Sequence, residues 1–206
     1  MRRIPLAVLT AGILAGFRSE VRAQQPGDSA SPTTQLTAEQ QIAAAVLAAP
    51  QEMRADATVL GYGPDGRLKK LRQGSGDLVC LASDPKAEHF HVACYHRSLE
   101  PFMARGRALR AHGITGDKVD SVRFAEVRAG KLRMPTHAAA LYSLTGPADS
   151  FDPATDTAPK AKPLFVVYVP FATGKSLGLS TTPAEGTPWI MHPGTPKAHI
   201  MFVPRM

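Results

Sequence analysis

The sequence contains little cysteine and no hydrophobic run long enough to cross a membrane. Two cysteines among 206 residues are too few for a disulfide-dense scaffold or a four-cysteine zinc site. The apolar run over residues 4–17 has 14 residues, and a helix of that length spans about 21 Å of the ~30 Å hydrocarbon layer. The later apolar run, residues 164–169, has only the length of a strand, and its continuous apolar character predicts a central strand covered on both faces. We therefore expect neither a disulfide-dense scaffold nor a transmembrane anchor.

The start of the chain has the pattern of a secretory signal. Arg2 and Arg3 precede the apolar run, and Val21-Arg22-Ala23 offers the small residues that a signal peptidase needs. This pattern predicts a signal peptide over residues 1–23 and a mature protein that begins at Gln24. No cysteine lies at the predicted cleavage site, so we expect no lipid attachment there. The predicted location is exported, either periplasmic or secreted.

The positive charge of the chain belongs in part to this signal. The formal net charge is +7, from 24 basic and 17 acidic residues. Removal of residues 1–23 takes away four arginines and one glutamate, which leaves 20 basic and 16 acidic residues and a net charge of +4. That balance, together with export, argues against nucleic acid as a partner.

The remaining sequence predicts a flexible leader followed by a single α+β domain. Residues 24–36 are rich in Pro, Ser, Thr and Gln, which is typical of a leader without a core. Thr37, with Gln40 three residues later, has the pattern of a capping box, so the domain is predicted over residues 37–206. We expect an antiparallel or mixed sheet packed by two or three helices. The expected strands are residues 57–62, 67–72, 78–82, 90–96, 138–144, 164–169 and 199–203, and the expected helices are residues 38–48, 98–111 and 119–130. Residues 119–127 also fit the alternation of a strand, although we favour the helix.

The two cysteines are predicted to form a disulfide bond. Cys80 and Cys94 lie on two expected strands and are symmetric about residue 87, in the middle of the connecting loop. An exported protein meets an oxidising compartment, where a close pair is oxidised. Closing a loop of about 15 residues stabilises the fold by ~3 kcal/mol in the chain-entropy treatment. The alternative is two separate buried thiols.

The densest chemical signal is the histidine-rich strand over residues 89–96. Alternation along a strand places His89 and His91 on one face, and Cys94 and His96 on the other. Only His89 and His91 can then act together, and two ligands are too few for a metal ion.

A third ligand would have to come from the C-terminal segment. His192 and His199 are available there, and the predicted metal set is His89, His91 and His199. Met191 and Met201 lie near these histidines, and sets of methionine and histidine suit copper, whereas histidine alone also suits zinc. The alternative is a solvated pair with structural histidines elsewhere.

Other patterns in the sequence are weaker signals of chemistry. Residues 174–178 match the G-x-S-x-G nucleophile pattern, but Pro183 and Pro188 follow where that motif needs a helix. Four arginines, Arg97, Arg105, Arg107 and Arg110, could bind an anion, although such residues usually form a solvated helix face. The single Trp189 could line a ligand pocket or pack against the sheet.

Two segments resemble parts of uncharacterised exported bacterial proteins. They are Leu141-Tyr142-Ser143-Leu144-Thr145-Gly146 and the stretch from Trp189 to Met201. The resemblance supports export and implies no activity. We therefore expect an exported, non-catalytic binding or structural module, with a small molecule or an anionic envelope component as its ligand. The alternative is a metal-binding protein, using zinc or copper, that could also be an enzyme.

Overall fold

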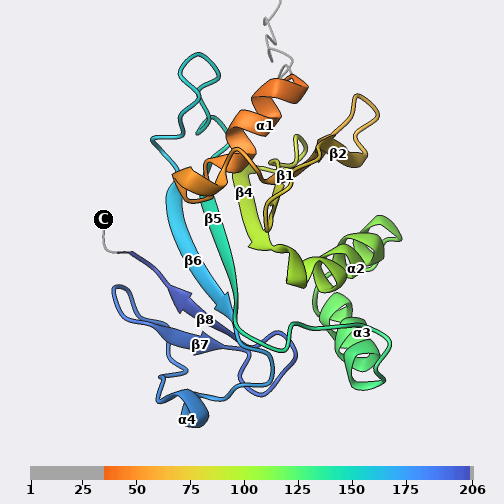
Figure 1. Ribbon diagram of the computed structural model, residues 1–206, viewed down its shortest axis with the longest axis vertical. Helices are drawn as coiled ribbons and strands as arrows, with labels where there is room; N and C mark the ends of the chain where they lie inside the picture. Colours follow the sequence, from red (N-terminus) through yellow and green to blue (C-terminus); the bar gives the residue numbers. More distant parts are fainter. Residues whose placement is uncertain (1–34, 205–206) are drawn as a thin grey trace, which may run out of the picture. The chain divides into compact units, whose positions relative to one another are not determined.

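A computed structural model describes residues 35–204, which form a mixed eight-stranded sheet with helices on both faces (Figure 1). The predicted signal peptide and the predicted leader up to residue 34 lie outside the described residues. The helices are α1 (Ala38–Val46), α2 (Glu100–Ala111), α3 (Asp117–Arg128) and α4 (Gly174–Leu177). The strands are β1 (Thr58–Tyr62), β2 (Leu68–Arg72), β3 (Leu78–Leu81), β4 (His89–His96), β5 (Ala139–Pro147), β6 (Lys162–Tyr168), β7 (Trp189–Met191) and β8 (His199–Phe202).

The strand order is β2-β1-β3-β4-β5-β6-β8-β7. β1 and β3 pair in parallel, and every other neighbouring pair is antiparallel. The predicted α+β class, with a mixed sheet packed by helices, is therefore confirmed.

Helix α1 forms where the capping pattern predicts it. The Thr37 hydroxyl accepts from the Gln40 backbone, and the Gln40 side chain accepts from the Thr37 backbone. Ala44 and Ala45 are buried, which lets the helix lie close to β1 through β4. Helix formation stops before Pro50, whose ring cannot continue it. We call the face of the sheet that carries α1 the α1 face.

Alternation along the strands divides the core between the two faces of the sheet. On the α1 face the central side chains are Val59, Cys80, Phe90, Val92 and Cys94, all at most 3% exposed. The opposite face buries a second cluster under α2 and its preceding turn: Val79, Tyr95, Leu99, Ala139, Val166 and Tyr168. Two hydrophobic layers therefore enclose the sheet at β3 and β4.

The predicted disulfide is present in the covered part of the α1 face. Cys80 and Cys94 are directly opposite each other on β3 and β4, with an S–S distance of 2.06 Å. Both residues are fully buried. The bond ties the two strands together beneath α1.

Three details of the fold differ from the sequence-based expectation. Strand β6 was expected to be covered on both faces, but Phe165 in its middle is 41% exposed. The short strand β7 and the one-turn helix α4 were not predicted, because Pro and Gly dominate their surroundings. Gln35 and Leu36 were assigned to the leader, yet the Gln35 amide donates to the Gly63 carbonyl and Leu36 packs on the core.

Candidate functional site

The predicted histidine pair on β4 shares one face, as alternation requires. His89 and His91 are exposed, whereas Phe90 and Val92 between and beside them are buried. The His91 Nδ1 atom lies 2.8 Å from the Thr145 hydroxyl. Partial desolvation by the surrounding protein lowers the pKa of His91 below its usual value.

His199 cannot join that pair, which corrects the predicted metal set. His91 pairs with Thr145 on β5, whereas His199 pairs with Tyr168 on β6 and through it with Ala139 on β5. Thr145 and Ala139 are six residues apart, which is about 20 Å along a strand. In addition, β4 lies three strands from β8, which is about 14 Å across the sheet. A single ion therefore cannot bind both His91 and His199. In residues 35–204 no group of three or more His, Cys, Asp or Glu side chains could hold a metal ion.

Three of the four arginines of the predicted cluster form ion pairs with carboxylates of the chain, whereas Arg110 is exposed. Arg105 makes a bidentate pair with Glu126, at 2.6 to 3.0 Å. Arg107 donates to Glu100 and to the Tyr95 hydroxyl, and Arg97 pairs with Asp77. Arg105 and Arg107 therefore stabilise α2 and α3 rather than present a joint anion site.

Ser176 has a structural role. Its hydroxyl completes the capping box of α4 by accepting from the Thr173 N–H and donating to the Thr173 carbonyl. A hydroxyl engaged in this way, on the first turn of a helix, is not held like a strained nucleophile.

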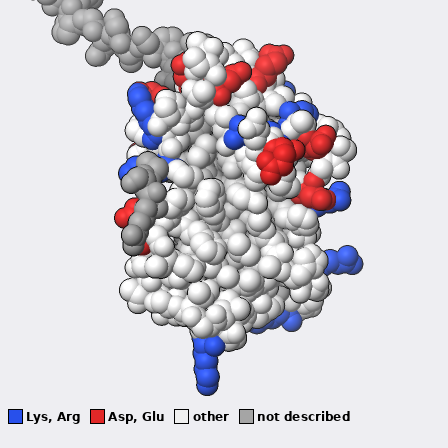
Figure 2. Space-filling model, turned by 60° about the vertical axis from the view of Figure 1, so that its left-hand side comes forward, with Lys and Arg blue, Asp and Glu red and all other residues white. Residues whose placement is uncertain are grey.

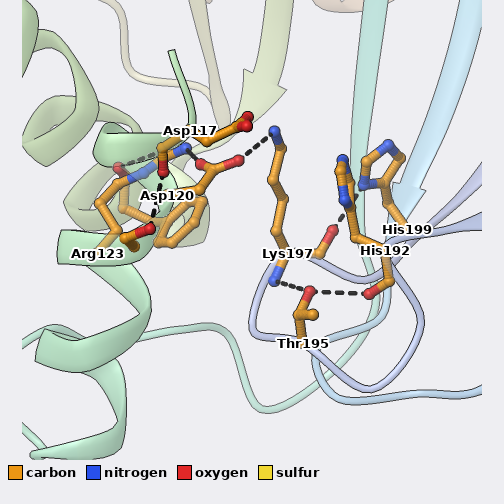
Figure 3. A network of polar contacts seen from close by, with 9 residues as sticks. Asp117, Asp120, Arg123, His192, Thr195, Lys197 and His199 are labelled. Atoms are coloured by element: carbon orange, nitrogen blue, oxygen red, sulfur yellow. Dashed lines mark hydrogen bonds and ion pairs between the residues drawn. The ribbon is translucent and has the colours of Figure 1, made fainter. Parts of the chain in front are cut away.

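A polar network connects α3 to the β7–β8 turn (Figure 3). Asp120 on α3 accepts from Arg123 through one carboxylate oxygen and from Lys197 through the other, the latter at 2.9 Å. Alone, burial would raise the pKa of Asp120, but the hydrogen bonds from Lys197 and Arg123 hold that pKa below its ordinary value. Asp120 therefore stays ionised and binds two cations from different parts of the chain.

Arg123 is the buried member of this network. Its side chain is 5% exposed, lies 3.9 Å above the Phe102 ring and donates to the Phe102 carbonyl. Gly106 makes room for it, since a Cβ there would lie 2.9 Å from an Arg123 nitrogen. The arrangement locks α3 onto α2 through a cation–π contact and a buried ion pair.

Two histidines stand side by side at the other end of the network. The ring centroids of His192 and His199 are 5.7 Å apart, and the Tyr168 ring stacks on His199 with centroids 5.1 Å apart. The His199 Nδ1 atom lies 2.6 Å from the Lys197 carbonyl oxygen. A carbonyl can only accept, so this nitrogen carries the proton and Nε2 keeps its lone pair.

Both imidazoles are neutral groups at neutral pH. Burial is the main cause that lowers the pKa of each ring, and the nearby Lys197 ammonium lowers both further. Burial also raises the pKa of Tyr168 to about 12. The residues between the histidines are held by the Thr195 hydroxyl, which donates to the His192 carbonyl at 2.8 Å and accepts from the Lys197 N–H.

An open surface pocket of about 780 Å³ lies next to this turn. We call it the Phe171 pocket. Its walls come from the end of α3, the loop before β5 and the segment after β6; they are Val127, Gly130, Leu132, Arg133, Met134, Pro135, Thr136, His137, Ala138, Val169, Pro170, Phe171 and Ala172. The volume lies within the range of small-molecule sites, and the lining is mainly apolar.

Phe171 is the unusual residue of this pocket. Its φ is +65°, in the left-handed region, and its side chain is 51% exposed. Left-handed backbone is costly for a bulky residue and persists only where the surroundings enforce it. The Phe171 N–H donates to the Thr195 carbonyl, and the Gly194 N–H donates to the Ala172 carbonyl. The β7–β8 turn therefore holds the aromatic ring at the pocket.

The part of the molecule around β6, β7 and β8 is poor in charge. Figure 2 brings this side forward and shows a broad face with few charged side chains. Phe165 and Phe202 are cross-strand partners on the α1 face and are 41% and 38% exposed. Trp189 is buried on β7, so packing rather than pocket lining is its role.

Sequence reasoning missed the Phe171 pocket and the Asp120 network. No sequence pattern links Lys197 to Asp120 and Arg123, because Lys197 is 77 residues from Asp120. The one available signal was the charged Asp120–Arg123 spacing on a helix face, which predicts only a local pair.

Comparisons of the chain with models of known families, with curated proteins and with solved structures find no match. No helix within residues 35–204 has the length and apolar character needed to cross a membrane. Function therefore has to follow from the geometry of the residues themselves.

Proposed function

We propose that the mature chain is an exported, non-catalytic binding module that takes a small amphipathic anion into the Phe171 pocket. Export is supported by the signal pattern of residues 1–23 and by the Cys80–Cys94 disulfide, since such bonds persist in oxidising compartments. The observation that carries the binding function is the strained Phe171, held half-exposed against a mainly apolar cavity.

The lining determines the class of ligand. Apolar and aromatic side chains form most of the wall, so an aliphatic or aromatic body gains from burial there. Arg133 and His137 are the only side chains of the lining that can be cationic, and no acidic residue lines it. Within residues 35–204 Arg133 has no ion-pair partner. A guanidinium in that position suits a carboxylate, sulfonate or phosphate head group.

The backbone strain at Phe171 supports a binding role over a purely structural one. An exposed aromatic side chain contributes little to the core, so stability alone does not account for a positive φ there. Strained positions concentrate at ligand-binding elements, where they fix a side chain in advance of binding. Preorganisation of this kind lowers the entropic cost of binding.

The experiment is a fluorescence titration of the mature protein with anilinonaphthalene sulfonate, an apolar fluorophore with one sulfonate. We expect one saturable site whose affinity falls about tenfold in Phe171→Ala and in Arg133→Ala. Matched controls are Phe202→Ala, an exposed aromatic residue outside the pocket, and Arg110→Ala, an exposed arginine on α2. Both controls should keep the affinity of the unmodified protein. Loss of binding in Phe202→Ala with full binding in Phe171→Ala would place the dye elsewhere and refute the proposal.

A further inference from the structure

The β7–β8 turn gathers three side chains that are soft or borderline metal ligands. Met191 ends β7, His192 follows it, and His199 begins β8. Met191 and His199 are direct cross-strand partners. Residues opposite each other in an antiparallel pair project from the same face with Cβ atoms about 4.5–5.5 Å apart. The Met191 thioether and the His199 imidazole therefore belong to one small cluster, which His192 completes.

The His199 ring is oriented as a ligand would be. The hydrogen bond from Nδ1 to the Lys197 carbonyl, at 2.6 Å, fixes the tautomer and leaves the Nε2 lone pair free. Metal-binding histidines usually donate their second nitrogen to a carbonyl or a carboxylate in this way. The Tyr168 ring, stacked on the imidazole at 5.1 Å, further restrains its orientation.

The spacing of the two imidazoles suits one shared ion. With metal–nitrogen bonds of about 2.0–2.1 Å, two rings on the same ion have centroids about 5–6.5 Å apart. The centroids of His192 and His199 are 5.7 Å apart, and Figure 3 shows the rings beside each other. His192 has a φ of +52°, so its backbone departs from the strand geometry of β7 at the point that brings its ring to His199.

The neighbouring charges permit a cation at this position. Lys197 is the closest cationic side chain in the network, and its ammonium donates to Asp120 at 2.9 Å. Figure 3 shows this side chain extended toward α3. The Asp120 carboxylate on another element therefore offsets part of this positive charge.

We propose that Met191, His192 and His199 bind a single copper(I) ion. Thioether ligands select copper(I) among the common metals of proteins, and imidazole is a good second donor. The set contains no carboxylate or thiolate, which zinc would ordinarily recruit. The site is independent of the Phe171 pocket, so either proposal can fail without the other.

The experiment is an anaerobic titration of the mature protein with copper(I) in competition with bicinchoninate. We expect one equivalent of copper(I) per chain. His192→Asn keeps a residue that tolerates left-handed backbone but lacks the imidazole, and it should abolish the site. Removing a residue that only hydrogen-bonds to a metal ligand typically lowers metal affinity about 10- to 100-fold. Met191→Leu removes a ligand itself, so it should lower copper(I) affinity at least about tenfold.

Matched controls test the assignment of each ligand. His91→Asn removes an imidazole of the β4 pair, and Met201→Leu removes the thioether on β8, which is not part of the proposed set. Both variants should retain full copper affinity. X-ray absorption spectroscopy at the copper edge of the loaded protein should show two nitrogen donors and one sulfur donor. The proposal is overturned if the unmodified protein binds no copper(I), if His91→Asn abolishes binding, or if His192→Asn leaves it unchanged. Loss in Met201→Leu with retention in Met191→Leu would equally reject the proposed set.

Discussion

Two parts of one sheet face differ in what covers them. Phe90 on β4 and Phe165 on β6 both project from the α1 face. Tyr142 packs in the same cluster as the buried Phe90, and Tyr142 is the cross-strand partner of Phe165. Phe90 is 3% exposed, whereas Phe165 is 41% exposed. We call the α1 face of β1, β3 and β4 the covered region, and the α1 face of β6 and β8 the open region.

The covered region holds features that stabilise the fold, whereas the candidate binding sites lie next to the open region. The covered region holds the disulfide and the alanine-lined contact with α1. The open region holds exposed aromatic residues, and the Phe171 pocket and the histidine pair lie at the end of the same strands. Elements with little buried apolar contact are the ones available for ligands. The disulfide and the α1 contact therefore lie at one end of the strand order, and the candidate sites lie toward the other end.

The largest expected effect compares the two phenylalanines directly. Phe90→Ala removes a buried ring that stacks on Phe151 and should lower the free energy of unfolding by about 3–5 kcal/mol. Phe165→Ala removes an exposed ring with one edge contact to Tyr142 and should cost about 1 kcal/mol or less. Urea denaturation of both variants measures the difference. Equal costs would mean that the open region is covered in solution.

The next effect is the loss of the disulfide. Replacing both Cys80 and Cys94 by Ala should lower the free energy of unfolding by about 3 kcal/mol, because the unfolded chain regains a loop of about 15 residues. The folded fraction should still bind anilinonaphthalene sulfonate within about twofold of the unmodified protein. Loss of dye affinity in the folded double variant would show that the covered region controls the pocket.

Sequence patterns predicted the covered region better than the open region, for physical reasons. The capping box of α1 and the symmetric cysteines are local signals, and both features are present. The apolar run of β6 indicates only that the strand can be buried. Whether a helix covers both of its faces depends on tertiary packing, which the run does not encode.

The candidate sites were harder to predict because their residues converge from distant segments. The Asp120–Lys197 pair and the Phe171 pocket depend on turns whose residues carry no periodicity. The histidine prediction failed at His199 because sheet order, rather than residue type, decides which strands are neighbours. The same-face placement of His89 and His91 needed only the period of a strand.

An intermediate effect concerns Asp120 and its pH dependence. The pKa of its carboxyl is below normal in the folded protein, because the Lys197 and Arg123 hydrogen bonds outweigh burial. The unfolded state therefore binds a proton more readily, and this contribution to stability is present above the unfolded pKa near 4 and lost as pH falls through the folded value. Asp120→Asn should cost about 1–2 kcal/mol at neutral pH and flatten the stability curve between about pH 5 and 3. Urea midpoints across that window test it; an unchanged slope would contradict the pairing.

The smallest effect on stability is expected at Phe171, where a substitution should not destabilise the fold. Glycine adopts a φ of +65° without strain, so Phe171→Gly should leave stability unchanged or raise it by up to about 1 kcal/mol. The same substitution should weaken dye binding. Thermal unfolding and the dye titration measure the two effects on one variant. A loss of more than about 1 kcal/mol would indicate that the ring supports the fold rather than a ligand.

The central claim, that ligand binding belongs to the Phe171 pocket next to the open region, is tested most directly by heteronuclear NMR of the mature protein titrated with anilinonaphthalene sulfonate. We predict that amide shifts concentrate in residues 127–138 and 169–172, with residues of α1 and the β3–β4 pair unchanged. Shifts centred on Phe165 and Phe202, or on the α1 end of the sheet, would contradict the account.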